Sequence, residues 1–231
     1  MARMRNTEKR VEILNVAFEL YMDKGYENVK FSEIAKQCGM SVQLLQHYFH
    51  KEQDILVELN YNILMRTFLF LSRHSSMYDS VPDEDAPIVP LVVYYRLMST
   101  VFTRNVKLFS LCREDMYDIR LLNNTVDHLC VGLRENLGER FVGGYEWENA
   151  LHVAAASQAS LFVRFTSDIS LTFPAEVIVE GTIRALCGYL EMGPDQCSRI
   201  LETAKELVTR DFEDEYLAYF EETYRDFKLI S

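Results

Sequence analysis

Glycine and proline are scarce in this chain, which has nine Gly and five Pro among its 231 residues. Because these two residue types supply most turns and interrupt regular structure, their scarcity favours long uninterrupted elements. No alternation of apolar and polar residues typical of a strand extends over a convincing length. No apolar run reaches the ~20 residues that a membrane-spanning helix needs, and no signal peptide is visible. We therefore expect an all-α, cytoplasmic protein.

Paired cysteines and catalytic motifs are also missing from the sequence. The five cysteines are scattered and form no CxxC pair, so we expect reduced thiols and neither a disulfide framework nor a zinc site. The five histidines show no HxxxH or HExxH spacing, and neither a GxGxxG loop nor a GxxxxGK phosphate loop occurs. The sequence thus predicts no catalytic residues, no metal and no cofactor, and an enzyme is the disfavoured class.

Positive charge is in short supply as well, because 24 Lys and Arg face 35 Asp and Glu, for a formal net charge of −11. The deficit is unevenly distributed along the chain. Residues 1–51 carry eight basic and six acidic side chains, whereas residues 52–231 carry 16 and 29. A polyanion such as DNA is therefore tolerated only at the N-terminal end, and the acidic remainder orients its approach.

That N-terminal end contains the most informative pattern, FSEIAKQCGMSVQLLQHYFHKEQDIL at residues 31–56. A first set of apolar residues at helical spacing stops at Gly39, which suits the left-handed residue that closes a helix. Ser41 is a good N-cap for a second helix that carries Leu45, Tyr48 and Phe49. Two short helices joined by a turn with glycine predict a helix-turn-helix, whose second helix lies in the major groove of DNA.

An amphipathic helix at residues 10–26 precedes this pattern, so three helices can close a small core. The order of these parts resembles the tetracycline-repressor (TetR) family of bacterial regulators. The resemblance rests on Ala17, Phe18, Lys24, Gly25, Tyr26, Ile34, Ala35, Gly39, Ser41, Leu45, Tyr48, Phe49, Lys51, Glu52, Ile55 and Leu56. It implies a helix-turn-helix DNA-binding domain at residues 1–51 and a larger helical ligand-binding and dimerisation domain at residues 52–231.

The remaining chain reads as a series of helices. Apolar helical patterns cover roughly residues 52–75, 88–114, 119–141, 146–167 and 174–191, and a proline-rich acidic loop occupies residues 76–90. A C-terminal helical extension at residues 194–228 goes beyond what the family pattern needs. We expect its aromatic stripe to cover the body or a partner subunit.

The second helix of the motif supplies most of the predicted DNA contacts. Gln can bond bidentately to adenine, and Val can touch a thymine methyl group. The resemblance assigns base contacts to Val42 and Gln43 and mostly contacts with the DNA backbone to Gln46, His47, Tyr48 and Lys51. Ser32 in the preceding helix can donate to a phosphate. The predicted DNA-binding residues are Ser32, Ser41, Val42, Gln43, Gln46, His47, Tyr48 and Lys51.

Two later helices carry many small side chains, which let helices approach closely. In TetR-like proteins the corresponding pair forms a four-helix bundle with its copy in a second subunit, and a helix-turn-helix reads palindromes as a two-fold dimer. We expect a homodimer through Ala154, Ala155, Gln158, Phe162, Ile178, Thr182 and Leu186. The alternative is that both helices pack inside one body.

The resemblance also implies a small-molecule pocket in the body. Aromatic and Met side chains with few polar groups suit an apolar or aromatic effector, and an Arg facing the cavity would favour an anionic group. The candidate lining residues are Tyr94, Tyr95, Met98, Phe102, Cys112, Arg113, Met116, Tyr117, His128, Phe162 and Phe165, with ordinary core packing as the alternative for each.

Together these features predict a ligand-responsive transcriptional regulator, by preference a repressor, that binds a palindromic double-stranded DNA operator as a dimer through residues 31–51. A transcriptional activator or a ligand-independent DNA-binding protein is the alternative. The sequence leaves the operator, the small-molecule effector and the regulated genes open.

Overall fold

The computed structural model describes residues 2–137, 145–166, 175–225 and 227, without the side chains of residues 2–6, 115, 132–137, 145, 165 and 166. Every regular element in these ranges is a helix, which confirms the all-α prediction. The elements are α1 (Ala2–Lys24), η1 (Tyr26–Asn28), α2 (Phe31–Gln37), α3 (Val42–Tyr48), α4 (Glu52–Arg73), η2 (Ser75–Tyr78), α5 (Val89–Arg104), α6 (Val106–Met116), α7 (Ile119–Leu137), α8 (Tyr145–Thr166), α9 (Ala175–Tyr189), α10 (Pro194–Leu207) and α11 (Arg210–Thr223).

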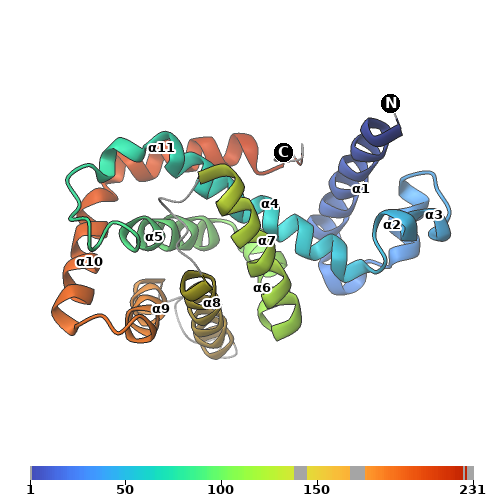
Figure 1. Cartoon of the computed structure of the whole chain (residues 1–231). Coiled ribbons are helices and arrows are strands. Elements are labelled where there is room, and N and C mark those ends of the chain that lie inside the picture. Colours follow the sequence, from blue (N-terminus) through green and yellow to red (C-terminus); the bar gives the residue numbers. More distant parts are fainter. Residues whose placement is uncertain (1, 138–144, 167–174, 226, 228–231) are drawn as a thin grey trace.

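Helices α1, α2 and α3 form a small head at one end of the molecule, and α4 runs from this head into the body (Figure 1). In the body, α11 lies along α4, while α8 and α9 pack against each other on the opposite side (Figure 1). Helix α4 is long and apolar enough to cross a membrane, but 72% of its apolar window is buried inside the protein. A buried share of this size is typical of the central helix of a core.

The head closes around a core to which all three helices contribute. Leu14 and Phe18 of α1, Ile34 of α2 and Leu45 of α3 are each at most 1% exposed. Between α2 and α3, Gly39 has a φ of +64°, the left-handed conformation that the sequence predicts there. A side chain at this φ costs roughly 1–2 kcal/mol, so glycine fits the turn best.

The helical pattern at residues 88–114 forms two helices instead of one, because the helix is interrupted at Asn105. This residue has a φ of −124° and a ψ of 83°, outside the helical region. Its side-chain Oδ1 accepts a hydrogen bond from the backbone N–H of Leu108 (3.0 Å) and so caps the start of α6. The prediction of a single helix was therefore wrong at this point.

The C-terminal extension packs on the body of the same chain and reaches the head. The hydroxyl of Tyr216 in α11 lies 2.7 Å from Oγ1 of Thr67 in α4, inside the core. Beyond the end of α11, the ring of Phe227 is fully buried 5.0 Å from the ring of Phe18 in α1. The last described residues therefore tie the body to the head.

Candidate nucleic-acid interface and interior cavity

Helix α3 turns one side to the core of the head and the other to solvent. Leu45 is fully buried, whereas Gln43, Gln46 and His47 are exposed, as the helical spacing predicts. Leu44 is also exposed at 44%, so an apolar side chain accompanies the three polar ones. Amide and imidazole groups can hydrogen-bond to base edges or phosphates, and an aliphatic group can touch a thymine methyl. The exposed side of α3 has the composition of a surface that reads a DNA groove.

Of the remaining predicted DNA-binding residues, Val42 and Tyr48 lie within α3 and are half-buried, whereas the others lie around it. Ser41 is its N-cap, and the Ser41 Oγ accepts a hydrogen bond from the backbone N–H of Leu44 (3.1 Å). Ser32 is exposed in the first turn of α2, next to Lys30, an exposed cation at the N-cap of that helix. Lys30 was not predicted as a contact, although a lysine at the start of the first motif helix is a sequence signal for a phosphate contact.

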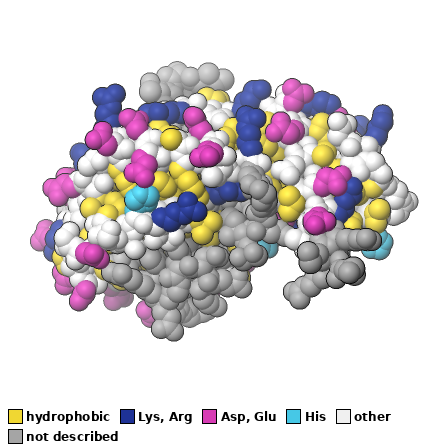
Figure 2. All heavy atoms as spheres, turned by 90° about the horizontal axis from the view of Figure 1, so that it is seen from above, with side chains coloured by type: hydrophobic (Ala, Val, Ile, Leu, Met, Phe, Trp, Pro, Cys, Tyr) yellow, Lys and Arg dark blue, Asp and Glu magenta, His cyan; other side chains and the backbone are white. Residues whose placement is uncertain are grey.

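Seen from the side of α11, acidic and basic side chains both occur on the surface of the body and on that of the head (Figure 2). Within the head, Lys24 forms an ion pair with Glu33, and Lys9 forms one with Glu12. Lys51 is the N-cap of α4, three residues after the end of α3, and its exposed amine appears in none of the ion pairs found in the described part of the chain.

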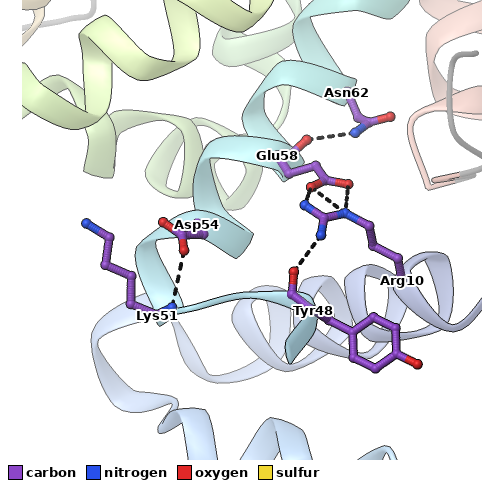
Figure 3. Close-up of polar contacts among 6 residues, drawn as sticks. All are labelled: Arg10, Tyr48, Lys51, Asp54, Glu58 and Asn62. Carbon is purple, nitrogen blue, oxygen red and sulfur yellow. Dashed lines mark hydrogen bonds and ion pairs between the residues drawn. The ribbon is translucent and has the colours of Figure 1, made fainter. Parts of the chain in front are cut away.

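The head is held to α4 by the side chain of Arg10 (Figure 3). Its Nε donates to both carboxylate oxygens of Glu58 in α4, at 3.0 and 2.9 Å, and its Nη1 donates to the backbone carbonyl of Tyr48 at the end of α3. The guanidinium carbon also lies 4.1 Å from the centre of the Phe49 ring. One arginine of α1 therefore fixes the end of α3 against α4.

A cavity of about 60 Å³ lies inside the body between α4, α5, α6, α7 and α8. Its wall is almost entirely apolar and aromatic, and the rings of Phe68 and Tyr94 stack there, with centroids 4.1 Å apart and planes 9° from parallel. The lining residues are Asn60, Leu64, Phe68, Leu91, Tyr94, Tyr95, Met98, Phe102, Cys112, Met116, Leu122, Thr125, Val126, Leu129, Leu151, Ala155 and Gln158.

Six of the predicted ligand residues line this cavity, namely Tyr94, Tyr95, Met98, Phe102, Cys112 and Met116. The structure places the other predicted residues elsewhere. Arg113 lies in a separate hollow of about 370 Å³ between η1 and α6. Tyr117 is 50% exposed, and His128 is exposed with its Nδ1 2.7 Å from the Asn124 carbonyl oxygen. Phe162 is buried 5.3 Å from the Phe109 ring, and the Phe165 side chain lies outside the described residues.

The predicted dimer residues lie inside the single chain. Ala154, Ala155, Phe162, Ile178, Thr182 and Leu186 are buried, and Gln158 is half-buried at the cavity. The pattern identified correctly that α8 and α9 pack closely: a Cβ added to Gly181 would lie 2.7 Å from Leu161 Cδ1. Small residues on the outer side, including Ala156 and Ser160 of α8 and Gly188 of α9, are exposed instead.

Comparison with known proteins identifies the head. The family model of the bacterial regulatory proteins of the tetR family matches residues 13–59, from the middle of α1 to the first part of α4. Neither the curated proteins nor the solved structures provide a match to this chain. The matched residues include the whole helix-turn-helix, both sides of α3 and the Glu58 anchor of Arg10. The head therefore carries the DNA-binding domain of the tetR family of bacterial regulatory proteins, and this match indicates a DNA-binding transcriptional regulator.

Proposed function

We propose that this regulator is a repressor that binds a palindromic operator as a homodimer and releases it when a small molecule occupies the interior cavity. The observation that carries the proposal is the double role of α4. Glu58 of this helix holds the head through Arg10, and Asn60, two residues further along, lines the cavity. A shift of α4 therefore acts on both sites.

The size of the cavity supports a coupling between the two sites. Sites for small molecules usually enclose ~300–1,000 Å³, whereas this cavity encloses about 60 Å³. A ligand of ordinary size must therefore part the lining helices, and Asn60, Leu64 and Phe68 place α4 among them. If the form with the helices parted holds the two heads of a dimer out of register with successive major grooves, the ligand lowers the affinity for the operator. By linkage, the operator then lowers the affinity for the ligand by the same factor.

The first experiment tests DNA reading by α3. An operator duplex is selected from a randomised pool, and its affinity is measured by fluorescence anisotropy over a salt series. Gln43→Ala and His47→Ala should each weaken the selected site, by ~1–3 kcal/mol where the side chain makes a bidentate base contact. The matched control is Gln53→Ala, an exposed glutamine at the start of α4. Unchanged affinity in the double variant of Gln43 and His47 would remove α3 from the interface.

The second experiment tests the dimer. We propose that α8 and α9 meet their copies through the outer side that carries Ala156 and Ser160, because these small exposed residues allow close approach. Ala156→Arg should then give monomers in sedimentation and reduce operator affinity, since a desolvated charge without a partner is costly. Ala218→Arg places the same change on an exposed position of α11 and should stay dimeric. A dimeric Ala156→Arg variant would locate the interface elsewhere.

The direction of regulation is tested with a reporter promoter that carries the selected operator. Expression of the regulator should lower reporter output, and the Gln43→Ala variant should lower it less. A rise in output on expression of the wild type would instead make the protein an activator.

A further inference from the structure

The amide of Asn60 is the most unusual polar group in the body. The residue is 1% exposed, and neither its Nδ2 nor its Oδ1 has a hydrogen-bond partner among the residues that the structure describes. Asn62, on the same helix, uses half of its amide: its Nδ2 donates to the Glu58 carbonyl at 2.7 Å, while its Oδ1 has no partner among the described residues. Thr67 bonds to Tyr216. A buried amide without partners destabilises a fold, and most buried polar groups in proteins are paired. Asn60 therefore has unused donor and acceptor capacity.

This residue is one of those that line the cavity. A leucine would fit a similar volume in this apolar wall without the cost of an unpaired amide. The other described polar side chains of the lining are those of Thr125, Gln158 and the two tyrosines, and the remaining lining residues are apolar. A few polar groups on the wall of a mainly apolar cavity are the arrangement that fixes the orientation of a ligand.

The rest of the lining restricts the charge of such a ligand. Among the described residues, the lining contains no Asp, Glu, Lys, Arg or His. An ionised ligand would lose its hydration there without gaining a counter-charge, which is strongly unfavourable. Arg113, the cation that would have favoured an anion, lies in the separate hollow beside η1. The cavity therefore favours an uncharged ligand.

The shape of the wall restricts the body of the ligand. The rings of Phe68 and Tyr94 stack on each other in the wall, and Met98 and Phe102 add a polarizable and an aromatic neighbour from α5. Flat rings pack well on such surfaces by offset stacking, and sulfur adapts to ring edges.

We propose that the cavity binds an uncharged, flat and mainly apolar molecule with an amide-like group, which Asn60 recognises through two hydrogen bonds. The Asn side chain presents an N–H donor and a C=O acceptor side by side. A carboxamide or lactam presents the complementary pair, whereas an ionised carboxylate presents acceptors alone. The inference rests on the proposed ligand response, since it names the ligand class of that same cavity.

The test uses matched aromatic probes on the full chain at neutral pH: benzamide with benzoate, and 2-naphthamide with 2-naphthoate and 2-methylnaphthalene. Calorimetric titration should show an amide binding at least tenfold more tightly than the methyl analogue, with no measurable binding of either carboxylate. In Asn60→Leu and Asn60→Ser the preference for the amide should disappear while 2-methylnaphthalene still binds. Asn62→Leu is the matched control, because Asn62 is a buried asparagine of α4 outside the cavity lining.

The outcomes separate this inference from the proposed function. Three results would each overturn the recognition by Asn60. The carboxylates could bind as tightly as the amides, all amides could fail to bind, or the preference for amides could survive Asn60→Leu and Asn60→Ser. If an amide binds through Asn60 and leaves operator affinity unchanged, the recognition stands and the ligand response fails. If a carboxylate binds and releases the operator, the response stands and the recognition fails.

Discussion

Replacement of Arg10 by methionine should loosen the head from α4. Arg10 bonds to Glu58 and Tyr48 and stacks on Phe49. Methionine keeps much of the apolar stem over the Phe49 ring, so the variant mainly removes the guanidinium. The Glu58 carboxylate would then remain in place with only 14% of its side chain exposed and without its cation.

The magnitude follows from the intermediate burial of this ion pair. Exposed pairs contribute ~0–1 kcal/mol, and breaking a fully buried pair costs ~3–5 kcal/mol. The side chains of Arg10 and Glu58 are 35% and 14% exposed, between these limits. We expect Arg10→Met to lower the free energy of unfolding by about 2 kcal/mol. The double variant Arg10→Met/Glu58→Met should lose less than this, since it leaves no unpaired carboxylate.

Urea unfolding followed by circular dichroism measures the stability, and anisotropy with the selected duplex measures operator affinity. Operator affinity should fall together with stability, because the backbone at the end of α3 loses its anchor on α4. The control is Arg120→Met, which removes an arginine that is 85% exposed and paired with Asp118, and should cost at most ~1 kcal/mol. If Arg10→Met matches this control in both assays, or the double variant is the less stable, the role assigned to Arg10 is refuted.

Three further perturbations test other parts of the structure. Hydrogen bonds from Arg199 hold the pKa of the buried Asp85 carboxyl below its usual value of 3.8, so this pair stabilises the fold at neutral pH and loses its effect as the pH falls below about 4. Asp85→Asn should therefore lower the urea midpoint at pH 7 and make the dependence of this midpoint on acid pH shallower. Equal pH profiles of the variant and the wild type would contradict the assignment. Phe227→Ala should lower the free energy of unfolding by ~3 kcal/mol and speed hydrogen exchange in α1 around Phe18, whereas Phe227→Leu should lower this free energy by less than ~1.5 kcal/mol. Unchanged hydrogen exchange in both variants would refute the contact between the C-terminal segment and the head. Asn60→Leu should raise the unfolding temperature by several degrees in the absence of ligand, at ~2–4 °C for each kcal/mol regained from the unpaired amide; a lower temperature would mean that the amide is satisfied inside the fold.

The head was predictable from the sequence because its signals are local. Gly39 takes the left-handed conformation, Ser41 caps α3, and Leu45 is buried while Gln43 is exposed. Each of these features depends on a few neighbouring residues and on the helical repeat, so the sequence pattern contains them directly. The family match to residues 13–59 agrees with that interpretation.

The break between α5 and α6 was missed although its signal was present. Both helices are apolar, and their combined pattern resembles one long helix. Asn105 is the only local sign, since asparagine favours caps and turns over helix interiors. A cap residue inside an apolar helical pattern therefore indicates a boundary even without glycine or proline.

The sequence by itself determined the helical class, the helix-turn-helix and the exposed side of α3, because these follow from contacts along the chain. Only the tertiary structure decided which apolar sides face inward. The small residues of α8 that we expected at a subunit interface, such as Ala154 and Ala155, are buried in the chain, and Arg113 lies away from the cavity. Phe227 meets Phe18 from the other end of the sequence, and the amide of Asn60 has no hydrogen-bond partner among the described residues. A helical repeat relates residues within one helix, but burial and pairing depend on which helices surround it, and packing of the whole chain sets that arrangement.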